Sequence, residues 1–286
     1  MARAFSYVPA YVVSLTWRTP HLRRVVIGGA GAAGWQASEV PDESVMLVLP
    51  HRDGALRMPD EQGGGDPARW YTVRRYDRRR DELSIDVADH PEGAMMRWTR
   101  SAAPGDPVGV SSVSSWWSRP PNAAWQVLIG DLTALPAIAR VLEEQSAGVP
   151  TSAVLEVPGA ADEQRLDAPP GTEIRWVHTP MGQPSGLADV ARSLVLPTGP
   201  GYVYAAGEAT AARALRRHLR HERRLTAGSY SVSGYWRHRC EEWMQRFRAA
   251  EHRLGLAELY ARFEAADADK EALTDEMDRR LDAAGL

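Results

Sequence analysis

The sequence has little cysteine and no long apolar run, and each shortage excludes a class of protein. Its 286 residues include one cysteine, Cys240, so it can form neither an intramolecular disulfide nor a multi-cysteine metal site. No segment approaches the ~20 consecutive apolar residues of a membrane span. Residues 1–20 carry Arg3 and Arg18 without the apolar run of a signal peptide. We therefore expect a cytoplasmic protein without a membrane span.

An excess of one charge is also missing. The chain has 34 Lys and Arg against 37 Asp and Glu, and the net charge of −3 gives no field that would attract nucleic acid. No His, Cys and carboxylate cluster has ligand spacing, so we predict no metal site. Tryptophan is abundant instead, with ten residues against three phenylalanines, and it suits flat ligand surfaces as well as cores.

The first part of the chain has the pattern of a β-barrel. Short segments rich in Val, Ile, Tyr and Thr alternate with Gly- and Pro-containing turns, and helical periodicity is weak. Together they indicate a closed or partly closed barrel over about residues 5–115. The predicted strands cover residues 7–16, 22–27, 45–49, 69–74 and 83–87.

Beyond Pro120-Pro121-Asn122, strands and helices alternate, which predicts a parallel, doubly wound α/β sheet. The predicted strands cover residues 125–129, 152–157, 173–177, 202–206 and 229–233. The predicted helices cover residues 134–144, 187–194 and 211–224. We expect a β-barrel domain over residues 1–119, an α/β domain over 120–240 and a C-terminal helical extension over 241–286.

Two charged surfaces are predicted near the C-terminus. The helix over residues 211–224 carries many arginines, which we interpret as a solvated basic face, with a phosphate contact as the alternative. The extension is expected to cap the α/β domain, and its densely charged end, from Asp267, is expected to be a solvated helix or frayed.

Residues 69–74 read Arg-Trp-Tyr-Thr-Val-Arg and carry the first functional signal. Because side chains alternate across a strand, Arg69 and Tyr71 share one face, and Thr72 and Arg74 share the other. The segment offers a guanidinium for a diphosphate, a flat ring and a hydroxyl. It resembles the flavin-binding strand of the siderophore-interacting proteins, FAD-dependent ferric-siderophore reductases of the ferredoxin-reductase superfamily. The alternative is an ordinary barrel strand with a basic rim.

Later segments resemble the same family in the same order. Residues 90–98 resemble a segment that opens a short helix and contacts the flavin diphosphate, and residues 130–136 and 206–208 resemble segments around the nicotinamide half of the second cofactor. Asp131, Thr133 and Glu208 have the alternative role of helix caps. The resemblance assigns cofactor binding to Arg69, Tyr71, Thr72, Arg74, His90, Gly93, Trp98, Asp131, Thr133, Ala134, Gly207 and Glu208.

Residues 234–237, Gly-Tyr-Trp-Arg, are the most specific match. In the family this tetrapeptide follows the last strand and approaches the flavin, and its arginine resembles part of a basic site for anionic ferric siderophores. The resemblance therefore assigns substrate binding to Tyr235, Trp236 and Arg237. The alternative is aromatic packing at a sheet edge.

The chain departs from the family's pattern at several cofactor contacts. Ala94 and Met96 stand where the family has Pro and Ser, and a thioether cannot donate a hydrogen bond to a phosphate. Leu132 and Thr179 replace a Glu and an Arg. Ser111-Ser112 and the residues that follow, up to Trp117, replace a Gly-Pro loop, and we expect a polar interdomain loop there.

Two functions follow. The first is an FAD-dependent oxidoreductase that takes hydride from NADH or NADPH and reduces the Fe(III) of a siderophore, with no certain catalytic side chain. The second is a diverged relative that holds a flavin or an apolar aromatic ligand without nicotinamide, as a binding protein or a non-redox biosynthetic enzyme. Leu132 and Thr179 favour the second. Glu156 ends a strand where an acidic residue commonly accepts from a ribose hydroxyl.

Overall fold

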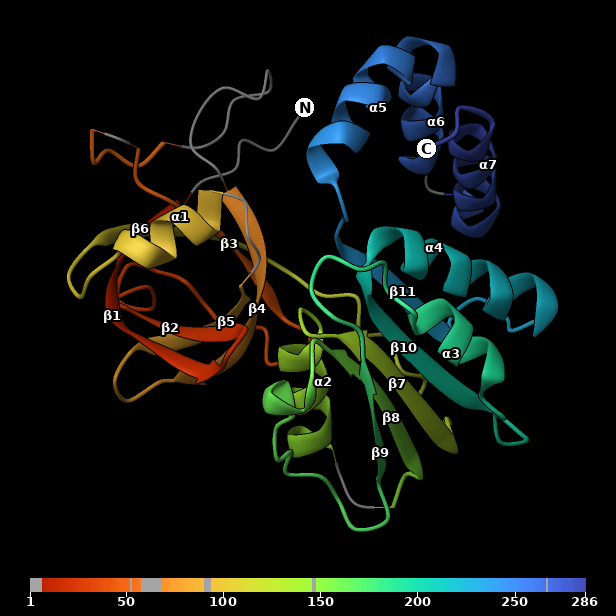
Figure 1. Ribbon diagram of the computed structural model, residues 1–286, viewed down its shortest axis with the longest axis horizontal. Helices are drawn as coiled ribbons and strands as arrows, with labels where there is room; N and C mark the ends of the chain where they lie inside the picture. The colour runs from red at the N-terminus through yellow and green to blue at the C-terminus, as the bar shows by residue number, and fades with distance from the viewer. Residues whose placement is uncertain (1–6, 52, 58–67, 90–93, 146–147, 266) are drawn as a thin grey trace.

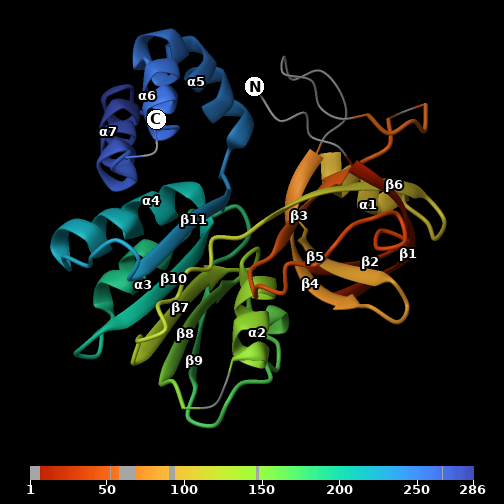
Figure 2. The ribbon, with the colours of Figure 1, turned by 180° about the vertical axis from the view of Figure 1, so that it is seen from behind.

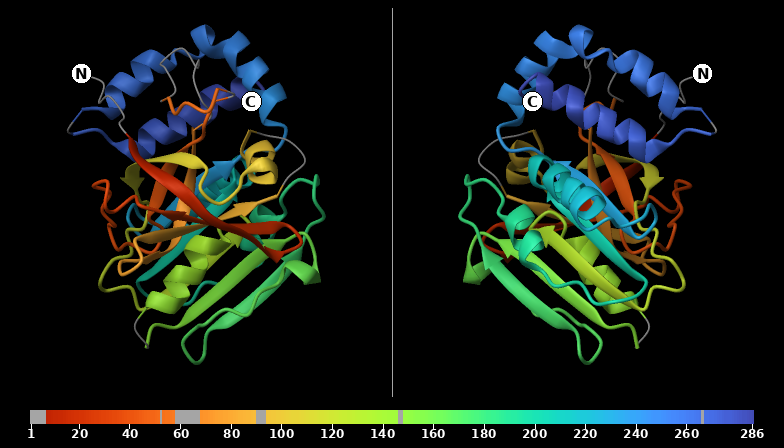
Figure 3. Two further views of the ribbon diagram at one scale, coloured as in Figure 1. Left: turned by 90° about the vertical axis from the view of Figure 1, so that its left-hand side faces the viewer. Right: turned by 90° about the vertical axis from the view of Figure 1, so that its right-hand side faces the viewer.

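The computed structural model describes residues 7–51, 53–57, 68–89, 94–145, 148–265 and 267–286, and it consists of three parts (Figure 1). A closed β-barrel is followed by a five-stranded parallel sheet and then by a group of helices. Seen from behind and from the sides, barrel and sheet lie next to each other, with the C-terminal helices above them (Figures 2 and 3). The predicted order of barrel, doubly wound sheet and C-terminal helices is confirmed.

The barrel is closed by antiparallel pairing throughout. Its elements are β1 (Tyr7–Thr19), β2 (Leu22–Gly28), β3 (Ser44–Val48), β4 (Ala68–Asp77), β5 (Glu82–Ala88), α1 (Ala94–Ser101) and β6 (Pro107–Ser114). The strand order is β1-β2-β5-β4-β3-β6, and β6 pairs with β1 to complete the ring. Alternate side chains fill the interior, among them the fully buried Val25, Ile27, Leu47 and Ile85.

The second sheet is parallel and has helices on both faces. Its elements are β7 (Trp125–Asp131), α2 (Leu135–Glu144), β8 (Thr151–Val157), β9 (Glu173–His178), α3 (Leu187–Ser193), β10 (Gly201–Glu208), α4 (Ala209–Arg217) and β11 (Tyr230–Trp236). The strand order is β11-β10-β7-β8-β9. Ile138 of α2 packs on the face that contains Leu128, and Leu215 of α4 packs on the face that contains Ile129. This double cover buries the apolar residues of the three inner strands, β10, β7 and β8, as parallel sheets require.

Three elements differ from the sequence-based prediction. Ser111 and Ser114, expected in a polar loop, belong to β6, because β3 and β1 both need a partner for the barrel to close. The helix expected to reach residue 224 is α-helical only to Arg217 and continues as the π-helical turn His218–Glu222. Tyr235 and its neighbour Trp236, expected after the last strand, lie within β11 beside β10.

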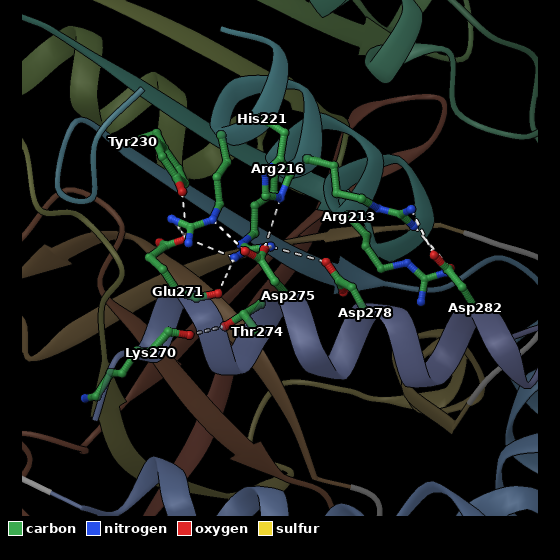
Figure 4. Close-up of polar contacts among 12 residues, drawn as sticks. Arg213, Arg216, His221, Tyr230, Lys270, Glu271, Thr274, Asp275, Asp278 and Asp282 are labelled. Atoms are coloured by element: carbon green, nitrogen blue, oxygen red, sulfur yellow. Dashed lines mark hydrogen bonds and ion pairs between the residues drawn. The ribbon is translucent and has the colours of Figure 1, made fainter. Parts of the chain in front are cut away.

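The C-terminal helices α5 (Cys240–Leu254), α6 (Leu256–Phe263) and α7 (Lys270–Ala283) form a small core of their own. α7 lies along α4, and the acids of α7 face the arginines of α4 (Figure 4). Arg216 binds Glu271, Asp275 and Asp278 at N–O distances of 2.9, 2.8 and 3.2 Å. The prediction of two solvated charged surfaces is therefore wrong, because these surfaces neutralise each other.

Polar contacts join the barrel to the sheet. Arg140 of α2 is buried and donates to the carbonyl oxygen of Val73 on β4 at 2.7 Å and to Glu144 at 2.7 Å. The carboxylate of Asp162, after β8, accepts from the hydroxyl of Thr19 on β1 at 2.7 Å. These contacts fix the orientation of the sheet against the barrel.

The predicted domain boundaries fall close to gaps between elements. β6 ends at Ser114 and β7 begins at Trp125, whereas α5 begins at Cys240. The division at 119/120 and 240/241 stays a prediction. Within the described part of the chain, no helix combines the length and the apolar character that crossing a membrane requires. The same residues contain no group of three or more His, Cys, Asp or Glu able to hold a metal ion.

Candidate functional site

Strand β4 carries the first predicted site residues along the side of the barrel that meets α2. Arg69 is exposed, and Tyr71 is half-buried against the barrel core, where burial raises its pKa above the usual range of a phenol. Thr72 is 6% exposed. Arg74 turns away to α2 instead, and its guanidinium donates to Glu143 at 2.7 Å. Arg74 therefore has a partner within the protein, and ligand binding by Arg69, Tyr71 and Thr72 stays a prediction.

A row of buried hydroxyl groups connects Thr72 with the sheet. Thr72 Oγ1 has no hydrogen bond of normal geometry within the described residues, and the hydroxyl of Tyr235 is the neighbour that interacts with it. The Tyr235 oxygen lies 2.8 Å from that of Tyr204, which donates to Asp42 at 3.5 Å. Burial raises the pKa of Tyr235 to about 12, so the row consists of neutral donors.

Asp42, at the end of this row, is fully buried in the turn before β3. Burial raises its pKa, although hydrogen bonds from Ser115 and from the backbone N–H of Trp116 favour the charged form. The carboxyl group thereby joins the segment after β6 to the turn before β3, next to the sheet.

Helix α1 directs its apolar side chains into the barrel. Trp98 is 8% exposed within the barrel core, and its indole N–H has no acceptor among the described residues. Met96, which stands where the resembling family has a serine, is buried in the same core, so this departure contributes to packing. His90 and Gly93 lie outside the described residues.

Asp131, at the carboxyl end of β7, gathers a second group of predicted residues. Its carboxylate accepts from the amide and hydroxyl of Thr133 at 2.9 and 2.6 Å, from the amide of Glu208 at 2.8 Å and from the indole N–H of Trp236 at 2.6 Å. Gly207 permits the close approach, since a Cβ there would lie 2.6 Å from the carboxylate. Burial raises the pKa of Asp131 despite these donors. Asp131 thus ties three segments together at the edge where such sheets bind ligands.

Ala134 and Glu208 have structural roles in the same region. Ala134 is fully buried, and a Cβ on Gly130 would lie 2.7 Å from its methyl group. Glu208 caps α4, because its carboxylate accepts from the backbone N–H of Thr210 at 2.8 Å and of Ala211 at 3.0 Å. Glu208 therefore has the alternative role of a helix cap. Its contact with a cofactor stays a prediction.

Glu156, at the end of β8, has its acceptors filled by the protein itself. Its carboxylate accepts from the hydroxyls of Thr179 and Ser185 at 2.7 and 2.6 Å and from the amide of Gly186 at 2.7 Å. Thr179, which stands where the family has an arginine, therefore helps to close off Glu156. A hydrogen bond to a charged group contributes roughly 1.5–3 kcal/mol, so a ribose would have to replace a substantial interaction.

Arg237 follows β11 and turns towards the C-terminal helices. Its guanidinium carbon lies 4.1 Å from the centroid of the Trp243 ring of α5, and one nitrogen lies 3.4 Å from the hydroxyl of Thr210. Burial lowers the pKa of Arg237, but a guanidinium keeps its charge at working pH. Trp236, the preceding residue, is 38% exposed.

Sequence reasoning did not single out Asp42, Tyr204 or Trp243. Asp42 has the pattern of an ordinary turn residue. The local sequence does not distinguish a buried turn aspartate from an exposed one. Tyr204 lies in a strand of the sheet core, and Trp243 has the pattern of an ordinary apolar position on a helix. Each gains its position only from elements that meet across the chain.

Comparisons with known proteins agree with this fold. Residues 11–113 match the family model described as the siderophore-interacting FAD-binding domain, and residues 123–239 match the model described as the siderophore-interacting protein. The crystal structure of a siderophore utilization protein from T. fusca is 34% identical, with a TM-score of 0.71 over 82% of this chain and 93% of that one. The barrel is therefore an FAD-binding domain.

Two reductases are among the curated relatives. Ferric vibriobactin reductase ViuB of Vibrio cholerae is 27% identical over 76% of this chain and 84% of its own length. The NADPH-dependent ferric-chelate reductase of Escherichia coli is 28% identical over 73% of this chain and 86% of its own length.

Proposed function

Since this chain belongs to the siderophore-interacting protein family, we propose that it passes electrons from NADH or NADPH through FAD to Fe(III) held by a siderophore. Both family models match in order, and two curated relatives carry the names of ferric reductases. Release of iron follows from reduction, because hard oxygen ligands hold Fe(II) less strongly than Fe(III). No protein ligand to iron is needed for this reaction.

The residues of β4 fit an FAD, and the match of residues 11–113 to the siderophore-interacting FAD-binding domain is the observation that carries the proposal. The hydroxyl of Thr72 is buried in this strand, beside that of Tyr235. In the proposed arrangement Arg69 binds the diphosphate, Tyr71 lies against the ring system and Thr72 contacts the ring edge. FAD held by these residues would supply the chemistry that links a two-electron nicotinamide donor to the one-electron reduction of ferric iron.

In this proposal the residues at the end of β11 bind the substrate as it approaches the flavin. A net charge of −3 gives no general attraction for an anionic ferric complex, so a local cation is needed. Arg237 supplies this cation, and the preceding residue, Trp236, supplies partly exposed aromatic surface. A guanidinium can form paired hydrogen bonds with catecholate or hydroxamate oxygens.

The absorption spectrum of freshly purified protein is the first test. We expect bound flavin, bleaching by NADH or NADPH under anaerobic conditions and formation of Fe(II) when a ferric siderophore is added. Thr72→Val should weaken FAD binding about threefold to tenfold, the effect of one net hydrogen bond. Thr16→Val, on the exposed side of β1, serves as the control. Protein that binds FAD but yields no Fe(II) with any ferric siderophore would refute the proposal.

Glu156 favours a second candidate, in which the protein holds a flavin or an aromatic ligand without using nicotinamide. The Glu156 carboxylate accepts hydrogen bonds from Thr179, Ser185 and Gly186. Because Thr179 stands where the family has an arginine, this chain also lacks one cation that could bind a phosphate. Loss of that charge-assisted contact alone corresponds to about tenfold to a hundredfold weaker binding. Stopped-flow reduction distinguishes the two functions. Rapid flavin reduction with a sub-micromolar NADPH dependence would exclude the second.

A further inference from the structure

Arg237 differs from the arginines of α4 in the groups that balance its charge. Arg213 and Arg216 bind carboxylates of α7 at 3.1 and 2.8 Å. Arg237 instead lies over an aromatic ring and approaches a hydroxyl, and the Glu208 carboxylate adds a nearby negative charge. A ring face attracts a cation through its quadrupole and occupies only the flat side of the guanidinium. The N–H groups on the edges of the guanidinium are thereby oriented for other acceptors.

Trp243, which provides this ring, is itself held by aromatic stacking. Its ring lies 4.8 Å from that of Phe247, one helical turn later, with an interplanar angle of 21°. The indole N–H of Trp243 is buried, and the described residues supply no acceptor for it. A donor near Arg237 thus lacks a partner among the residues that the structure describes.

The position of Trp243 depends on the contact between α7 and α4. The C-terminal helices have their own apolar core, formed by residues such as Leu259 and Leu273. Their described contacts with α4 are made by long charged side chains, and Figure 4 shows Arg216 directed at a row of acids on α7. Arg213 also donates to the C-terminal carbonyl oxygen of Leu286 at 2.6 Å. α7 therefore anchors the group of helices that carries Trp243.

We propose that the C-terminal helices complete the substrate site, with Trp243 as a positioning residue that orients Arg237 towards an anionic ferric complex. This inference rests on the proposed function. Trp243 holds the guanidinium by its face and so preserves the edge donors for the oxygens of the complex. The helices then confer a preference for anionic over neutral complexes.

Binding of redox-inert gallium complexes tests the proposal without turnover. Calorimetry measures the affinity of the FAD-loaded protein for anionic Ga(III) tris-catecholate and for neutral Ga(III) tris-hydroxamate. Trp243→Ala should weaken binding of the anionic complex about tenfold and of the neutral complex less than about twofold, the scale of one cation–π contact. Trp243→Leu keeps apolar volume without a ring face and should show the same selective loss. Trp243→Phe should restore most of the preference.

Tyr260→Ala is the matched control, because Tyr260 is 53% exposed on α6. Equal losses for both complexes in Trp243→Leu, or an unchanged preference, would overturn the positioning role. A parent protein that binds neither complex and reduces neither ferric counterpart would instead overturn the proposed function. Far-UV circular dichroism of each variant confirms that the helices remain folded.

Discussion

Tyr71 joins barrel packing and the proposed flavin site in one side chain. It lies half-buried against the barrel core, beside Thr72 with its buried hydroxyl. We expect Tyr71→Ala to weaken FAD binding by about 1–3 kcal/mol, the scale of an aromatic contact and its hydrogen bond. Fluorescence titration of apoprotein with FAD measures the change. Tyr71→Phe separates the ring from the hydroxyl, and equal affinity of parent and alanine variant would remove Tyr71 from the site.

Asp42 should give the protein a specific pH dependence. Burial raises its folded-state pKa above the unfolded value of 3.8. The native state therefore binds the proton more tightly, and the resulting stability is complete below the unfolded pKa and is lost as the pH rises through the folded pKa. We expect the unfolding free energy of the parent, relative to Asp42→Asn, to fall as the pH rises above about 4.

Urea unfolding across this pH range measures the difference, and Asp267→Asn, at the surface, is the control for Asp42→Asn. A difference that grows with pH would show that the donors from Ser115 and Trp116 outweigh burial.

At the scale of elements, the pairing of α4 with α7 turns two charged helices into one interface. Arg216 is 8% exposed and contacts three carboxylates. Arg216→Met leaves these carboxylates without their shared cation, and loss of one partner from a buried ion pair costs about 3–5 kcal/mol. We expect faster amide hydrogen exchange throughout α5–α7. Arg279→Met, at the surface of α7, should leave exchange unchanged, and equal protection in both variants would contradict an anchoring role.

At the scale of the whole molecule, Arg140 couples the sheet to the barrel. It donates to the carbonyl oxygen of Val73 and lies 3.7 Å from the buried carboxylate of Glu43. Arg140→Met leaves the carbonyl oxygen and the carboxylate without their cationic partner. We expect the unfolding free energy to fall by about 3–5 kcal/mol. Denaturant unfolding followed by FAD release and by circular dichroism should show two separated transitions in place of one. Arg75→Met, exposed on β4, is the control. Coincident transitions with an unchanged midpoint would rule out this coupling.

The sequence by itself determined the order of the fold and the position of its motifs. Alternation along β4 and the change from strands to alternating strands and helices near Pro120 are local patterns, and they predicted both sheets. β6 was not predicted, because its serine-rich end has the composition of a loop. It becomes a strand because it pairs with β1 and β3 to close the barrel. The Gly-Tyr-Trp-Arg segment was located by sequence, although its strand extends further than expected.

Only the tertiary structure decided which charges and hydroxyls meet. Thr179 fills an acceptor of Glu156, 23 residues earlier, and Arg216 reaches Asp278, 62 residues later. Arg74 has a partner on α2, and Arg237 has one on α5. Which acceptor a donor binds depends on the distance between them and on their burial. The residues adjacent in the sequence specify neither quantity. The family motifs could therefore be found in the sequence, whereas the partners of their side chains depend on how distant elements pack.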